Sequence, residues 1–122
     1  MKDLNNDIPG QSEDALQQKC YVWFWNNYPH LRGLLFAVPN GGARDAKEGK
    51  KFKLTGLVPG VSDLIFLYRT QAYLIELKKD DKAKLSTNQK EWKEIVEHHG
   101  FVYFVVRSLT DFKRLMNQLI VE

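Results

Sequence analysis

The stretch Asp63–Lys78, DLIFLYRTQAYLIELK, decides how the rest of the chain must fold. Residues 63–68 and 72–78 are rich in aromatic, leucine and isoleucine side chains, and a short polar segment around Arg69 and Thr70 separates them. This spacing predicts two strands joined by a tight turn. Because apolar side chains occupy both alternating sets of positions, we expect a sheet that is covered on both faces.

The few charged side chains of this hairpin fall at one end. If the turn is centred between Arg69 and Thr70, Asp63 lies opposite Glu76, and directly opposed residues have Cβ atoms about 4.5–5.5 Å apart. Lys78 follows Glu76 by two residues and therefore projects from the same face. The pattern predicts two carboxylates and one ammonium group that converge at one end of an apolar sheet.

Opposed carboxylates repel each other, and a divalent cation between them removes that cost. Mg²⁺ suits such a pair because it takes oxygen ligands, often one or two carboxylates completed by water and substrate phosphate. A cation lowers the pKa of bound water, and a lysine beside it can orient that water or stabilise charge on a phosphorane. An ordinary Asp–Lys–Glu salt-bridge cluster at a strand end is the alternative interpretation.

Helices and strands flank the hairpin. Ser12 is the predicted N-cap of a helix over residues 12–27, whose inward stripe would contain Glu13, Leu16, Gln17, Cys20, Trp23 and Phe24. Residues 34–38 predict a strand bounded by Gly33 and Pro39. The early part of the chain therefore supplies one helix and one strand.

The part after the hairpin predicts a helix, a strand and a final helix. Ser86 and Gln89 form a predicted capping box for a helix that ends near His99, with Trp92, Ile95 and Val96 inward. Residues 101–106 predict a strand that runs parallel to the one before the helix, and a closing helix starts near residue 110. The fold class is therefore α/β, a sandwich with a central mixed sheet of about four strands flanked by helices.

Composition sets limits on the class of protein. The chain has 122 residues, of which 43% are hydrophobic and 27% charged, which fits one globular domain over residues 12–122 behind a flexible lead of residues 1–11. Cys20 is the only cysteine, so no intrachain disulfide can form. There is no apolar stretch of membrane-spanning length and no sign of a secretory signal. We expect an intracellular, cytoplasmic protein without a membrane partner.

A basic stretch precedes the hairpin. Pro39-Asn40-Gly41-Gly42 predicts a turn, and residues 43–55 predict a helical or partly helical segment that carries Arg44, Lys47, Lys50 and Lys51. A solvated helix face is the common outcome for such a charge run, whereas phosphate contacts need a neighbouring site. Asn40 and the two glycines could let the backbone approach a nucleic acid closely, or could form a plain turn.

At this point the residues resemble the PD-(D/E)xK nuclease motif, and more specifically the virus-type replication-repair nuclease (VRR-NUC) family. The resemblance covers about residues 12–108, in the family's order, and one departure is Ser62, where the family usually has proline. The matching segments are Ser12-Glu13 with Gln17, Pro39–Arg44, Gly56–Asp63, Tyr73–Lys78, Leu85–Trp92 and Gly100–Val106.

The resemblance implies a restriction-endonuclease-like fold and Mg²⁺- or Mn²⁺-dependent hydrolysis of DNA phosphodiesters. The family's metal ligands map onto Glu13, Asp63, Glu76 and the backbone carbonyl of Leu77. The motif lysine maps onto Lys78 and a helix glutamine onto Gln89, both with catalytic roles. Gln17 becomes an expected hydrogen-bonding partner of the metal ligands.

The resemblance also bears on partners. Standalone members resemble structure-selective endonucleases, including homodimeric resolvases of four-way (Holliday) junctions in DNA replication, recombination or repair, so we expect branched DNA and a homodimer. The segment with Asn40, Arg44, Lys47, Lys50 and Lys51 would then contact DNA. The remaining alternatives are a catalytically inactive DNA-binding or assembly module with a nuclease fold, and an RNA nuclease.

Overall fold

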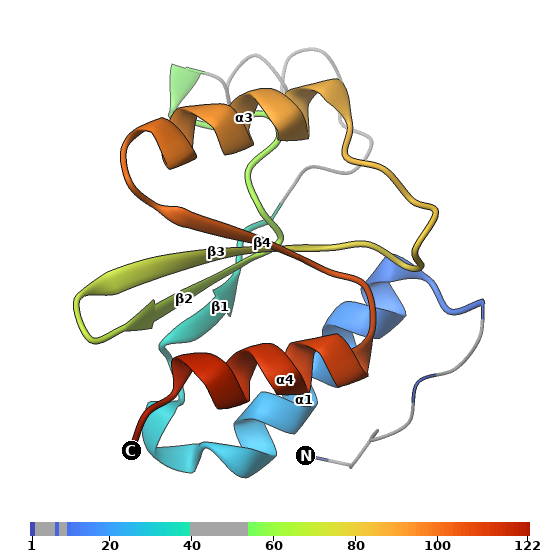
Figure 1. The fold of residues 1–122 in the computed structure, drawn as a ribbon, viewed down its shortest axis with the longest axis vertical. Helices are drawn as coiled ribbons and strands as arrows, with labels where there is room; N and C mark the ends of the chain where they lie inside the picture. The colour runs from blue at the N-terminus through green and yellow to red at the C-terminus, as the bar shows by residue number, and fades with distance from the viewer. Residues whose placement is uncertain (2–6, 8–9, 40–53) are drawn as a thin grey trace.

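Four strands form one mixed sheet with helices on both of its faces (Figure 1). This computed structural model describes residues 1, 7, 10–39 and 54–122. The predicted α/β sandwich is confirmed. The described elements are α1 (Glu13–Asn27), the short 3-10 helix η1 (Pro29–Leu31), β1 (Leu35–Ala37), β2 (Leu64–Tyr68), β3 (Gln71–Leu77), α3 (Thr87–His98), β4 (Val102–Val106) and α4 (Leu109–Leu119).

The β2–β3 hairpin has the predicted register. Ile65 pairs with Leu74 and Leu64 pairs with Ile75. The two turn residues, Arg69 and Thr70, have positive φ values of 48° and 67°. Positive φ at both central positions is typical of the two-residue turns whose twist matches that of the flanking strands.

The sheet has the order β1-β2-β3-β4. β1 and β2 are antiparallel, as are β2 and β3, whereas β3 and β4 are parallel. Parallel neighbours cannot be joined by a tight turn, so α3 provides the crossover between them. The predicted parallel strand after the helix is therefore confirmed, and so is the Ser86–Gln89 capping box that starts α3.

The main core lies between the sheet and the layer formed by α1 and α4. The rings of Phe24 and Phe66 pack edge to face, with centroids 5.5 Å apart. Ser12 caps α1 by accepting a hydrogen bond from the Ala15 N–H, as predicted. Of the predicted inward stripe, Leu16, Cys20 and Phe24 are fully enclosed; the other core residues include Leu31, Leu35, Leu64, Tyr68, Ile75, Leu77, Val106, Leu109, Phe112, Leu115 and Met116.

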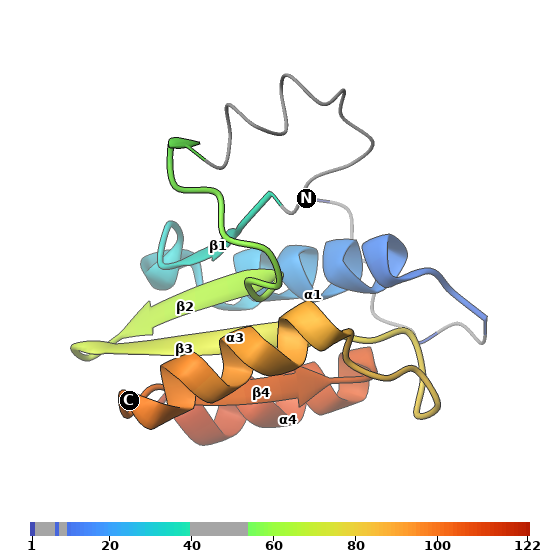
Figure 2. The ribbon, with the colours of Figure 1, turned by 90° about the horizontal axis from the view of Figure 1, so that it is seen from above.

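The predicted cover on the opposite face of the sheet is present as α3, and the described residues leave part of that face exposed. Figure 2 shows α3 lying along β3 and β4. A crossover helix joins neighbouring strands and therefore covers those two, which leaves Leu67 on β2 42% exposed and Phe36 on β1 38% exposed. The prediction that Ile95 faces inward is wrong, because its side chain is 58% exposed.

Residues near the start of the chain contact the helical layer. The Asp7 carboxylate accepts hydrogen bonds from the Leu109 N–H at 2.6 Å and the Thr110 hydroxyl at 2.9 Å, at the start of α4. Lys19, absent from the predicted stripe of α1, is buried and donates to Gln11 at 2.9 Å. Of the helices in the described ranges, none has the length and apolar character needed to cross a membrane.

The hairpin turn generates a test of backbone strain. Thr70 is β-branched and has a left-handed backbone conformation. This conformation costs an L-residue roughly 1–2 kcal/mol and costs glycine little. After the entropy that glycine gains in the unfolded chain, Thr70→Gly is expected to raise the free energy of unfolding by about 0.5–1 kcal/mol, measured by urea denaturation. Thr70→Ala keeps a Cβ atom and serves as the control; equal stability of the two variants would contradict the strain.

Candidate functional site

Asp63 connects three strands at the end of the sheet away from the hairpin turn. Its backbone carbonyl accepts a hydrogen bond from the Val38 N–H at 2.9 Å, just beyond β1. Its carboxylate Oδ2 accepts from the Leu77 N–H at 2.8 Å, at the end of β3. The Asp63 side chain is therefore fixed beside the last residues of β3, where the register also brings Glu76.

Glu76 is a buried carboxyl group with an incomplete set of partners. Glu76 is 1% exposed, and its Oε2 accepts a hydrogen bond from the Gln89 Nε2 at 2.9 Å. Its Oε1 is buried and has no hydrogen-bond partner within the described part of the chain. Burial, and next the charge of Asp63, raise the pKa of Glu76 to about 8. The predicted juxtaposition of two carboxyl groups is present and electrostatically unfavourable.

Lys78 lies beside this pair and is also buried. Its Nζ donates to the Gln89 Oε1 at 2.9 Å and lies 3.8 Å from the Glu76 Oε2. The Gln89 Oε1 accepts a second hydrogen bond from the Ser86 N–H at 2.8 Å, which is part of the capping box of α3. The same amide therefore starts the helix and links Lys78 to Glu76.

The loop before β2 fits closely against the first turn of α3. Gly60 has φ +83°, and a Cβ atom there would lie 2.2 Å from the Asn88 backbone oxygen. Any side chain would push apart the segments that carry Asp63 and Gln89. Ser62, which stands where the VRR-NUC pattern has proline, is buried and donates its hydroxyl proton to the Leu64 carbonyl at 3.1 Å.

Glu13 at the start of α1 reaches the same end of the sheet. Its Oε2 accepts a hydrogen bond from the Lys79 N–H at 3.3 Å. Its negative charge contributes to the raised pKa of Glu76, after burial and Asp63. In the described ranges no three His, Cys, Asp or Glu side chains form a ready-made metal-binding group. Glu13 is thus near the pair without closing a three-carboxylate cage.

The other predicted site residues have different outcomes. Gln17 lies one turn after Glu13 on α1, in the wall of a cavity between α1 and β1. The Leu77 N–H donates to the Asp63 carboxylate, so the Leu77 carbonyl is the backbone group that could bind a cation. The predicted DNA-binding residues fall outside the described part of the chain; they are Asn40, Arg44, Lys47, Lys50 and Lys51.

Tyr103 is a site neighbour that the sequence interpretation missed. It is 7% exposed, and its hydroxyl is buried without a hydrogen-bond partner among the described residues. Burial, followed by the charges of Glu76 and Asp63, raises the pKa of Tyr103 above its usual range. Strand alternation could have found it, because Tyr103 on β4 pairs with Leu74, two residues before Glu76.

The raised pKa of Glu76 generates a prediction about pH. The unfolded chain ionises Glu76 near 4.5, whereas the folded chain holds the proton until about 8. The contribution of the protonated Glu76 to the stability of the fold is therefore complete below pH 4.5 and is lost as the pH rises towards 8. In chelator-treated protein, the melting temperature of wild type should fall over this range relative to Glu76→Gln, which does not titrate. The exposed Glu91→Gln control should follow wild type, and parallel curves for all three proteins would contradict the raised pKa.

Comparisons with known proteins agree with this arrangement. The sequence matches the family model of the VRR-NUC domain over residues 11–109. No curated protein matches the chain. A solved structure described as a VRR_NUC domain protein is similar with a TM-score of 0.75 and 25% identity, covering 93% of this chain and 91% of that one.

A second solved structure, described as a VRR_NUC domain, supports the fold. Its TM-score is 0.60 at 21% identity, with 88% of this chain and 97% of that chain covered. The family model spans most of the chain, including the hairpin with Asp63, Glu76 and Lys78 and the helix with Gln89. The chain therefore belongs to the VRR-NUC domain family and has a nuclease fold.

Proposed function

We propose that this protein is a Mg²⁺- or Mn²⁺-dependent endonuclease that hydrolyses DNA phosphodiester bonds. The observation that carries the proposal is the buried Glu76 next to the half-buried Asp63, with the buried Lys78 beside them. Two carboxyl groups in this position destabilise the metal-free fold. A salt-bridge cluster that only stabilised the fold would not need the second carboxyl group. The membership in a nuclease-fold family supports the same proposal.

The donor atoms at this end of the sheet fit a hard divalent cation. Glu76 offers a buried Oε1 that has no hydrogen-bond partner among the described residues, and Asp63 offers the carboxylate oxygen not bonded to Leu77. The Leu77 carbonyl and Glu13 would complete the protein ligands. Mg²⁺ needs few protein ligands because it retains water and binds substrate phosphate. When bound, such a cation polarises water and neutralises charge on the phosphate.

The side chains of the protein would provide position and charge. Lys78 is held by Gln89 at 2.9 Å, so its ammonium group has a fixed direction. A lysine in this place orients the attacking water and stabilises the negative charge that develops on the phosphorane. Gln89 also binds Glu76, and therefore keeps Lys78 and the carboxylate at a constant separation.

The substrate in this proposal is branched DNA, such as a four-way junction in replication, recombination or repair. Paired incisions on two symmetric strands need two active sites, which a homodimer with twofold symmetry provides. Asn40, Arg44, Lys47, Lys50 and Lys51 are the proposed contacts to the DNA backbone, since phosphate contacts fix orientation without reading sequence.

Cation binding is tested by melting the protein at pH 8 with a chelator and then with Mg²⁺ or Mn²⁺. A ligand that binds only the folded state adds about 2.7 kcal/mol at a hundred times its Kd, so the melting temperature should rise. Asp63→Asn should lose this rise, while the exposed Asp81→Asn should keep it. A wild type that melts equally with and without cation would refute the proposed metal centre.

Catalysis is tested by cleavage assays on linear, flapped and four-way-junction DNA, with an RNA of matching sequence. Lys78→Ala and Asp63→Ala should each lower the cleavage rate by about 100-fold or more, because charge stabilisation at the phosphate is lost. Lys90→Ala is a matched control, since Lys90 is exposed and next to Gln89 on α3.

Each outcome of the cleavage assay addresses a separate part of the proposal. Variants that cut as fast as wild type would show that the site is assigned wrongly. Equal cleavage of every DNA would remove the selectivity for branches, and faster cleavage of RNA would change the substrate class. Absence of cleavage by wild type would favour an inactive binding module.

A further inference from the structure

A row of side chains on α1 leads away from the carboxylate pair. Glu13, Gln17, Tyr21 and Trp25 follow one another at intervals of four residues. Side chains with this spacing lie on one face of a helix, and twelve residues of helix span about 18 Å. The row therefore begins with a carboxylate at the candidate metal site, continues with an amide and ends with two aromatic rings.

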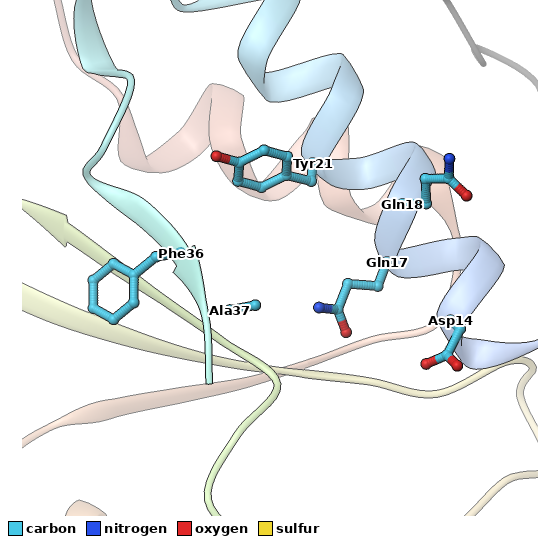
Figure 3. Close-up of a pocket in the computed structure, with 6 residues that line it drawn as sticks. All are labelled: Asp14, Gln17, Gln18, Tyr21, Phe36 and Ala37. Atoms are coloured by element: carbon cyan, nitrogen blue, oxygen red, sulfur yellow. The ribbon is translucent and has the colours of Figure 1, made fainter. Parts of the chain in front are cut away.

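The middle of this row forms one wall of an open cavity (Figure 3). Figure 3 shows Gln17 and Tyr21 pointing from α1 towards β1, which is an edge strand of the sheet. The cavity has a volume of about 460 Å³ and is lined by Asp14, Gln17, Gln18, Tyr21, Phe36 and Ala37.

The cavity adjoins the candidate active site on two sides. On one side, Ala37 pairs with Leu64, and the next residue, Val38, donates its N–H to the Asp63 carbonyl. On the other side, Gln17 lies one helical turn from Glu13. The cavity therefore lies next to the segments that carry Asp63 and Glu13.

The aromatic end of the row is held in place by a cation. The rings of Tyr21 and Trp25 have centroids 6.2 Å apart and are tilted by 33°. The Arg32 guanidinium carbon lies 4.3 Å from the centroid of Trp25, and its Nε donates to the Trp25 carbonyl at 3.0 Å. Trp23, by contrast, packs inward on Phe112 with centroids 6.0 Å apart. Trp25 is thus half-buried beside a positive charge, outside the main core.

The lining of the cavity indicates the kind of group that it takes. Among the described residues that line it there is no lysine or arginine, and the one charged side chain is the acidic Asp14, so these residues disfavour a phosphate inside. Aromatic rings offer stacking faces, and the amides of Gln17 and Gln18 offer both donors and acceptors. Proteins recognise unpaired nucleobases with this combination of stacking and edge hydrogen bonds. The positive charge of Arg32 at the far end suits the phosphate backbone.

We propose that the row from Gln17 to Trp25 binds an unpaired nucleic-acid strand, with a base in the cavity and another stacked at Trp25. The inference rests on the proposed nuclease function and specifies its substrate further. A base within a duplex has its faces covered by stacked neighbours and its edge occupied by its partner, so it cannot enter the cavity. Among branched DNAs, the substrate would therefore be one with an unpaired segment, such as a flap or gap, next to the cleaved phosphate, in preference to a fully paired four-way junction.

The test measures binding by fluorescence anisotropy, with Ca²⁺ present to prevent turnover. The labelled probes are a short single-stranded DNA, the same sequence as RNA, and the blunt DNA duplex. Tyr21→Ala and Trp25→Ala should each weaken single-strand binding by roughly 5- to 100-fold, the loss expected for one stacked base, and leave duplex binding within about twofold. The RNA probe shows which type of strand the row prefers.

Control variants separate stacking from folding. Tyr21→Phe keeps the ring and should bind single strands within about twofold of wild type. Phe101→Ala removes an aromatic side chain that is 45% exposed and lies outside the row, just before β4, and should change nothing. Tyr21 packs partly against the core, so melting curves accompany each variant; Trp25→Ala, outside that core, tests the inference if Tyr21→Ala is unfolded.

The outcomes distinguish this inference from the proposed function. If single-strand binding is unchanged in Tyr21→Ala and Trp25→Ala, or if single strands and duplex lose affinity equally, the proposed single-strand binding by the row is refuted. The proposed nuclease function is not affected by that result. Specific loss of single-strand binding in a protein that never cleaves DNA would support the row and overturn the nuclease. A wild type that neither binds nor cleaves nucleic acid would overturn both.

Discussion

The register of β2 against β3 is the constraint on which the candidate site depends. The two-residue turn at Arg69 and Thr70 sets that register at one end of the hairpin, and its consequence appears at the other end, where Asp63 meets Glu76. Side chains alternate between faces along a strand, so a shift of one residue would turn Glu76 towards the α1–α4 layer. The strained turn therefore helps to keep both carboxyl groups at one end of the sheet.

This placement has an electrostatic cost that the surroundings offset only in part. Glu76 is buried next to Asp63, and its carboxyl group keeps a proton up to a pH of about 8. Lys78 and Gln89 contact one oxygen of Glu76, whereas the other has no partner in the described part of the chain. Groups that destabilise a fold in this way are common where function sets the arrangement, because a proton or a bound cation relieves the repulsion.

The helix α1 shows how one element serves both stability and the site. One row of its side chains, with Leu16, Cys20 and Phe24, fills the core against the sheet. The neighbouring row starts at Glu13 and passes Tyr21 on the side of β1. Because both rows belong to one rigid helix, the packing of the first fixes the position of the second. The covered face of the sheet thus stabilises the fold, while the less covered face carries the carboxylates.

The sequence by itself determined the elements and the charged end of the hairpin, because strand alternation, turn spacing and capping are local properties. They placed Asp63, Glu76 and Lys78 on one face, and the family resemblance added Glu13 and Gln89. The tertiary structure decided what depends on segments far apart in the chain. The contact of Gly60 with Asn88, the buried hydroxyl of Tyr103 and the exposure of Ile95 follow from how α3 lies on the sheet, and no local pattern encodes that position.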